Sequence, residues 1–169
     1  MTWAEFEAAA PELAVAARSL IERHGFVYAG TVRRDGAPRI SPVEAHLVGR
    51  ELMLVMIAGS QKARDLARDP RVTLQSPVTD PADPGDELKL RGRVASVDER
   101  QRVATADAVE AASGWRPRPS WRYFAVDVLA VAVLTWERGD MLLQRWDAAR
   151  GALPPSRRRL DADASAYVE

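Results

Sequence analysis

The stretch that decides the fold is YAGTVRRDGAPRISPVEAHLVGRELMLVMIAGSQKARDLARDPRVTLQSP, residues 28–77. Short apolar segments alternate there with turn residues, a pattern that is typical of antiparallel strands. Arg34-Asp35-Gly36 is a hairpin turn signal. The expected elements are strands at 26–32, 39–48, 51–58 and 71–76, with a short helix at 61–68 inserted before the last of them. Pro42 lies inside the second strand and indicates an edge or a bulge.

The flanking sequence extends this pattern. Residues 4–24 are expected to form one helix that Gly25 ends, and Asp98 can cap a helix through about Ser113. Further strands are expected at 88–97, 123–135 and 141–145, and Gly92 indicates a bulge or a close backbone approach. Two segments rich in Pro, 77–87 and 115–120, are expected to be loops.

Mostly antiparallel strands at short spacing predict a barrel. The fold class is therefore expected to be mostly β with flanking helices, in a single domain over residues 1–169. Within it we expect an N-terminal helix (about 4–24), a barrel core (about 26–147) and a polar tail (148–169) that is loosely ordered.

Composition narrows the function classes. The chain has 24 basic and 24 acidic residues and no net charge, which disfavours a broad nucleic-acid-binding surface. It has no Cys, which excludes disulfides, thiolate metal sites and Cys nucleophiles. Glu5, Glu7 and Glu12 precede the first basic residue, Arg18, which does not fit a secretory signal, and no apolar run is long enough to span a bilayer. A cytoplasmic protein without a membrane partner is expected.

The best local signal for chemistry is GSQK, residues 59–62, at a strand-to-helix junction. The start of a helix has free backbone N–H groups and partial positive charge, so it attracts phosphate, and Lys62 adds a full charge. Ser60 can cap the helix or donate its hydroxyl to an anion. Arg39 begins the neighbouring strand and can bind phosphate through two N–H groups. Each residue alone also fits a purely structural role, but their placement beside one hairpin predicts a shared anion.

Residues 28–77, followed by LKLRGRVASVDE (88–99), resemble the flavin-binding core of the pyridoxamine 5′-phosphate oxidase-like proteins. The resemblance implies an FMN-binding split β-barrel of Greek-key type, and a homodimer with the flavin in a groove at its interface. It also implies that Arg39 and Lys62 bind the flavin phosphate. The other cofactor-binding residues that it implies are Ile40, Ser41, Pro42 and Val43 on the second strand, Val55 and Met56 on the third, and Ser60 and Gln61 before the phosphate Lys.

The chain departs from that family at its substrate end. Glu44 stands where true pyridoxamine phosphate oxidases have a Lys that meets the substrate phosphate, and it would repel that group. Gln61 replaces an Arg, and Glu87 aligns with a flavin-contacting Gln. Trp136 and Trp146 are candidates for the Trp that completes the family's site. Vitamin B6 oxidation is therefore not expected.

The remaining polar residues suggest no second mechanism. His46 and Glu44 can share one face of a strand as a proton-transfer pair, although a solvated face explains them as well. His24 fits the last turn of the first helix. Two His without partner ligands at metal spacing predict no metal site, and the catalytic residues stay unassigned.

The sequence thus predicts a flavin-dependent oxidoreductase that uses FMN and a small-molecule substrate. F420 is the alternative cofactor, and a basic groove beyond Arg39 and Lys62 would favour it because F420 carries an acidic glutamyl tail. A non-catalytic module that binds flavin or haem is the alternative from another class, although haem would need an axial His and only His24 and His46 are available.

Overall fold

The computed structural model describes residues 1–78, 85–137 and 139–159. Its strands form one sheet in the order β3-β2-β1-β4-β5-β6-β7-β8, and β3 also pairs with β6. The strands are β1 (Phe26–Val32), β2 (Pro38–Val48), β3 (Glu51–Met56), β4 (Arg71–Gln75), β5 (Glu87–Ser96), β6 (Arg122–Glu137), β7 (Asp140–Asp147) and β8 (Gly151–Arg159).

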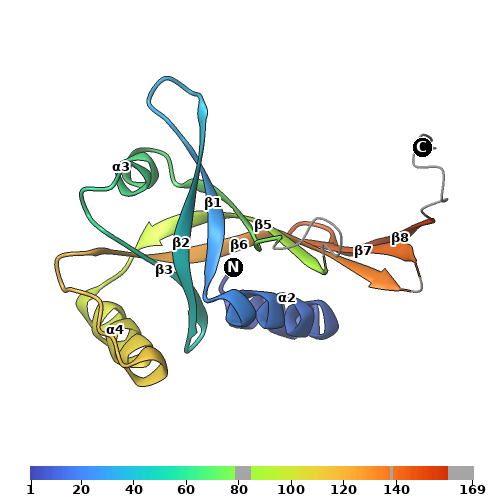
Figure 1. The fold of residues 1–169 in the computed structure, drawn as a ribbon, viewed down its shortest axis with the longest axis horizontal. Coiled ribbons are helices and arrows are strands. Elements are labelled where there is room, and N and C mark those ends of the chain that lie inside the picture. Colours follow the sequence, from blue (N-terminus) through green and yellow to red (C-terminus); the bar gives the residue numbers. More distant parts are fainter. Residues whose placement is uncertain (79–84, 138, 160–169) are drawn as a thin grey trace.

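The pairing of β3 with β6 closes six antiparallel strands into a barrel. Strands β1 to β3 follow one another as hairpins, and β4 returns to pair with β1, which is the strand order of a Greek key. The mostly β fold and the split-barrel architecture expected from the sequence are confirmed. Strands β7 and β8 continue the sheet beyond the barrel as an extension along the long axis of the molecule (Figure 1).

In the part of the chain that the structure describes, four helices flank the barrel: α1 (Trp3–Ala9), α2 (Pro11–His24), α3 (Gln61–Arg68) and α4 (Glu99–Ser113). In Figure 1, α2 lies below the strands, whereas α3 lies at the upper left and α4 at the lower left. Asp98 caps α4 in a capping box with Gln101, as the sequence indicates. Within the described residues, no helix is long and apolar enough to cross a membrane.

The core fills the barrel and continues beneath α1 and α2. Val27, Leu54, Leu74, Leu90 and Val126 are buried almost completely. In the part of the core beside α1, the ring centroid of Phe6 lies 5.3 Å from that of Trp3 and 5.1 Å from that of Trp146. Aromatic packing therefore joins helix α1 to strand β7.

Two expectations about the chain ends are wrong. Residues 4–24 form two helices and not one, because Pro11 lacks a backbone N–H and starts a new helix after Ala10. The polar tail is not loosely ordered at 151–159, where β8 pairs with β7. Cross-strand ion pairs contribute there, since the guanidinium of Arg157 lies 2.7 Å from Glu137 and 3.3 Å from Asp140. Residues 160–169 of the expected tail, and 79–84 of the expected loop, lie outside the described residues.

Gly92 combines the bulge and the close approach that the sequence indicates. The register between β5 and β6 shifts between Arg91 and Gly92. A Cβ atom on Gly92 would lie 2.6 Å from the backbone oxygen of Asp127 and 2.8 Å from Cγ1 of Val126. The barrel wall therefore has no room for a side chain at this position.

We predict that Gly92→Ala destabilises the protein by roughly 1–3 kcal/mol, because the new methyl group displaces the backbone of β6. Urea unfolding followed by Trp fluorescence measures this change. Gly59→Ala is the matched control, since a Cβ there meets nothing within 4 Å. Equal stability of the two variants would contradict the role given to Gly92.

Candidate functional site

The carboxylate of Asp65 organises the end of the barrel under α3. Asp65 is only 3% exposed. Its Oδ2 accepts hydrogen bonds from Nε of Arg39 at 2.7 Å and from the hydroxyl of Thr31 at 3.1 Å. Its Oδ1 accepts a bond from Nη2 of Arg68 at 3.2 Å. One buried carboxylate thus connects α3 with neighbouring positions of β1 and β2, since Thr31 and Arg39 are register partners.

These contacts determine the charge of the carboxylate. Burial raises the pKa of Asp65, but the hydrogen bonds from Arg39, Arg68 and Thr31 outweigh burial and hold the pKa below its ordinary value of 3.8. Asp65 is therefore ionised at neutral pH. Its carboxylate accepts the hydrogen bond from Nε of Arg39, so the two Nη groups of the same guanidinium remain as donors for a ligand.

An arginine-rich hollow of about 610 Å³ surrounds this cluster. We call it the arginine hollow; its lining residues are Arg33, Arg34, Asp35, Arg39, Gln61, Arg64, Asp65 and Arg68. Five of these eight side chains are arginines, against two carboxylates. The hollow is thus a positively charged site between the β1–β2 hairpin and α3.

A second hollow, of about 250 Å³, lies where β2, β3 and the start of α3 meet. We call it the lysine hollow; it is lined by Phe26, Pro42, Val43, Glu44, Val55, Met56, Ile57, Lys62 and Trp121. Five cofactor-binding residues expected from the sequence line it together: Pro42, Val43, Val55, Met56 and Lys62. Apolar walls with one cation and one carboxylate suit a flat ring system with a polar edge.

The structure does not place Arg39 and Lys62 in one hollow. Side chains alternate along a strand, so Arg39 and Ser41 share one face of β2 while Ile40, Pro42 and Glu44 share the other. The first turn of α3 connects the two hollows, because Gln61 lines the arginine hollow and the next residue, Lys62, lines the lysine hollow. A ligand that contacts both cations has to reach around this turn.

The other expected cofactor residues lie around the same turn. Ser60 caps α3 by accepting a hydrogen bond from the backbone N–H of Ala63 at 3.4 Å. Ser41 is half-buried, on the same face of β2 as Arg39. Ile40 is 76% exposed on the outer face of the barrel. Pro42 lies where β2 has no partner on the β3 side, since pairing with β3 begins at Glu44, and the expected edge position is confirmed.

Glu44 and His46 share the outer face of β2, as their spacing indicates. Oε2 of Glu44 lies 3.6 Å from Nε2 of His46, and Glu44 also faces the lysine hollow with Lys62. The Nε2 atom of His46 is buried, and no described residue offers it a hydrogen-bond partner within 3.5 Å. The carboxylate of Glu44 disfavours an anionic group placed directly beside it.

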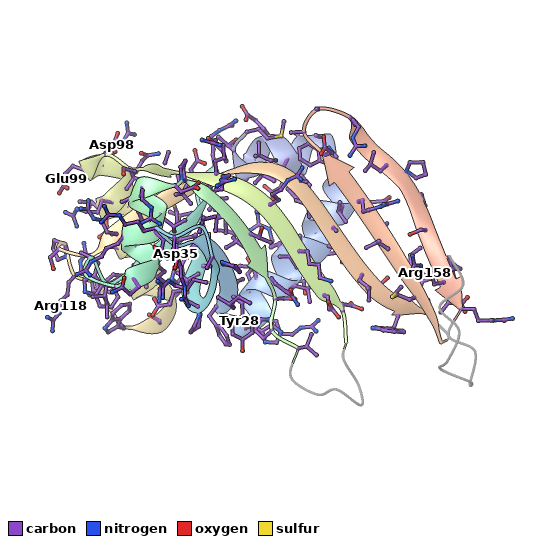
Figure 2. All side chains as sticks on the ribbon, turned by 90° about the horizontal axis from the view of Figure 1, so that it is seen from above. Tyr28, Asp35, Asp98, Glu99, Arg118 and Arg158 are labelled. Atoms are coloured by element: carbon purple, nitrogen blue, oxygen red, sulfur yellow. The ribbon has the colours of Figure 1, made fainter. Side chains whose placement is uncertain are left out.

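The tryptophan that lies at the candidate site differs from the ones expected from the sequence. Trp146 is 3% exposed and packs in the core, so it is not available to the site of its own chain. Trp121 instead lines the lysine hollow, and its ring lies 5.3 Å from that of Trp115. Arg158, in the Arg triplet of β8, lies at the far end of the molecule from Asp98 and Arg118 (Figure 2).

Sequence reasoning identified Arg39 but missed Asp65 and the other arginines around it. The available signal is the spacing of Lys62, Asp65 and Arg68, which places three charges on one face of a helix whose neighbours Ala63 and Leu66 are buried. A carboxylate on the buried side of a helix needs a cationic partner, and Arg39 and Arg68 are those partners.

We predict that Asp65→Asn lowers the free energy of unfolding by roughly 1–3 kcal/mol at neutral pH, because two guanidinium groups lose their charged acceptor. A carboxylate whose pKa is depressed by folding stabilises the protein above its unfolded-state value and loses this effect as pH falls through the folded-state pKa. The difference between the two proteins should therefore shrink below about pH 3.8. Urea unfolding across pH 3–7 measures it, with the exposed Asp35→Asn as control. A difference that is independent of pH would contradict the assignment.

The sequence matches the family model for pyridoxamine 5′-phosphate oxidase over residues 13–137, a range that contains most of α2, all of α3 and α4, and all six barrel strands. A search of curated proteins found no match.

Solved structures share the fold at low identity. A pyridoxamine 5′-phosphate oxidase-related, FMN-binding protein from Nostoc punctiforme PCC 73102 has a TM-score of 0.57 at 16% identity, over 92% of this chain and 96% of that one. A haem-binding protein from Mycobacterium smegmatis has a TM-score of 0.54 at 16% identity, over 85% and 87%. An F420 reductase has a TM-score of 0.54 at 23% identity, over 68% and 94%. At these identities the likeness establishes the fold and leaves the ligand open.

Proposed function

Because the chain belongs to the pyridoxamine 5′-phosphate oxidase family, we propose that it is a cytoplasmic oxidoreductase that binds FMN between two copies of itself. The observation that carries this proposal is the lysine hollow, which unites Pro42, Val43, Val55, Met56 and Lys62 against Trp121. A flavin-binding redox role also suits the FMN-binding neighbour. Bound FMN supplies hydride or electron transfer, and the protein contributes binding, orientation and electrostatics.

In this proposal Lys62 and Arg39 bind the flavin phosphate from either side of the first turn of α3. The backbone of α3 adds the free N–H groups of its first turn, which favour an anion. Asp65 orients Arg39 from behind by holding Nε at 2.7 Å, which reduces the entropy lost when the guanidinium binds a ligand. The strand residues Ile40, Ser41, Pro42 and Val43 then follow the flavin toward its ring.

A second copy of the chain has a suitable surface beside this site. Pro42 lies opposite Tyr28, and Ile40 lies opposite Gly30, on the outer face of the barrel. Ile40, Tyr28 and Ile57 are 76%, 40% and 58% exposed. Contiguous exposed apolar side chains are typical of protein interfaces, so we place the second copy here, over the flavin.

The substrate is not pyridoxamine phosphate in this proposal. Glu44 lies in the lysine hollow and repels a substrate phosphate. No side-chain acid or base needs to be assigned, because hydride transfer to or from a flavin belongs to the cofactor. The small-molecule substrate is considered further below.

We predict that Arg39→Ala combined with Lys62→Ala weakens FMN binding by about a hundredfold or more, since each charge-assisted hydrogen bond contributes about 1.5–3 kcal/mol. Riboflavin, which lacks the phosphate, should lose far less. Quenching of flavin fluorescence measures both affinities. Lys89→Ala with Arg100→Ala removes the same charge from exposed positions on β5 and α4 and should change neither.

Equal losses for FMN and riboflavin would contradict the phosphate roles. If the folded protein binds neither FMN nor F420 at micromolar concentration, the cofactor assignment is wrong. A Soret band in the absorption spectrum of the purified protein would show that the cofactor is haem and not flavin.

F420 is the second candidate cofactor, and the arginine hollow favours it. Arg33, Arg34 and Arg64 line this hollow beyond Arg39 and are exposed. The acidic glutamyl tail of F420 extends past the phosphate and would contact these cations. FMN ends at its phosphate and would not reach them. A neighbour of the same fold is an F420 reductase.

If F420 is the cofactor, Arg34→Gln with Arg64→Gln should weaken the binding of F420 at least tenfold, because the tail of F420 reaches these residues. The affinity for FMN, which has no such tail, should change by no more than about twofold. Fluorescence titration with each cofactor measures the difference. Tighter binding of FMN than of F420 to the unmodified protein, with no effect of the two substitutions on F420, would exclude this candidate.

A further inference from the structure

A second concentration of positive charge lies on the outer face of β4 and β5. Arg71 lies directly opposite Arg93, and Thr73 lies directly opposite Arg91. Like charges directly opposite each other on neighbouring strands destabilise a sheet. Packing within the barrel therefore gives no reason for three arginines at these positions.

Carboxylates neutralise these arginines only in part. Nη2 of Arg71 lies 2.5 Å from Oδ2 of Asp69, and the hydrogen bonds from Arg71 lower the pKa of Asp69 to about 2. Nη2 of Arg91 lies 3.4 Å from Oδ2 of Asp147. Arg93 forms no ion pair with any residue that the structure describes. The arginine pair on β5 thus leaves positive charge available to a ligand.

The surface between these arginines is hollowed and apolar at its base. Gly30, Thr73 and Arg91 follow one another in register across β1, β4 and β5, and the small residues Gly30 and Thr73 leave the base open. The resulting hollow measures about 420 Å³ and is bounded by Ile40 on one side and Leu129 on the other. Leu129 lies in the register shift opposite Arg91 and Gly92, so the bulge in the barrel wall shapes this side of the hollow.

Charge at the rim and apolar surface at the base select a particular ligand chemistry. A small hydrated anion gains little from the apolar base, and a neutral ring gains little from the arginines. A flat apolar body with one carboxylate uses both, because its ring is removed from water while the arginine fork binds the carboxylate. The volume of the hollow suits a ligand of one or two fused rings.

We propose that this hollow binds an aromatic or similarly flat apolar carboxylate through Arg91 and Arg93, and that this is the substrate class of the enzyme. The assignment as substrate rests on the proposed function. Arg39 and Ile40 line the hollow and also belong to the expected cofactor residues, so the ligand would lie beside the flavin.

The test is calorimetric titration of the full-length protein with 2-naphthoate, with its neutral counterpart 2-naphthol, and with acetate. We expect 2-naphthoate to bind at least tenfold more tightly than either of the other two. Arg91→Gln with Arg93→Gln should weaken the binding of 2-naphthoate at least tenfold and leave the affinity for 2-naphthol unchanged. The matched control is Arg23→Gln with Arg100→Gln, which removes the same charge from exposed positions on α2 and α4 and should leave the binding of 2-naphthoate unchanged.

Binding of 2-naphthoate no tighter than that of 2-naphthol would overturn the proposal, as would a loss that follows the control substitutions in place of Arg91 and Arg93. FMN titration of the same proteins separates this proposal from the proposed function. If FMN binds and 2-naphthoate does not, the carboxylate site alone is wrong. If 2-naphthoate binds through Arg91 and Arg93 and FMN does not, the site stands and its assignment to a flavin enzyme is wrong.

Discussion

The pairing of β3 with β6 is the constraint on which the rest of the molecule depends. Four register pairs, from Met53 opposite Ala125 to Met56 opposite Arg122, close the barrel. Closure removes the unpaired edges of both strands and encloses the core. It also fixes where β3 ends, and therefore where α3 begins, one residue before Lys62. The lysine hollow exists because a strand, a helix start and Trp121 meet at this seam.

At the end of the barrel, Asp65 has a comparable role on a smaller scale. A helix that carries a buried carboxylate can only pack where cations and a hydroxyl satisfy it, and Thr31, Arg39 and Arg68 do so. The position of α3 against the β1–β2 hairpin is thus specified by polar contacts as well as by Leu66. The same contacts orient the arginine that is proposed to bind phosphate, so the proposal couples stability and ligand binding at one carboxylate.

Local signals in the sequence were enough to predict much of the fold. The bounds of β1 and α3 agree with the expected 26–32 and 61–68, because turn residues and a capping Ser mark their ends. Gly92 was also informative, since only a close approach or a bulge explains Gly inside an apolar strand. The strand 151–159 was not predictable from its composition, because two prolines and three arginines are typical of a solvated tail. It forms as an edge strand, where proline is tolerated and where Glu137 and Asp140 compensate the arginines.

The candidate site was less accessible from the sequence than the fold, because its contacts join distant residues. Asp65 is 34 positions from Thr31 and 26 from Arg39. The alternation of β2 indicates that Arg39 and Pro42 face opposite ways, but it does not show that the first turn of α3 lies between their two hollows.

The most direct test of the central claim is a crystal structure of the protein with FMN. We predict that the flavin phosphate lies at the first turn of α3, within hydrogen-bond distance of both Arg39 and Lys62, with the ring in the lysine hollow against Trp121. A flavin phosphate bound away from these two residues would contradict the account.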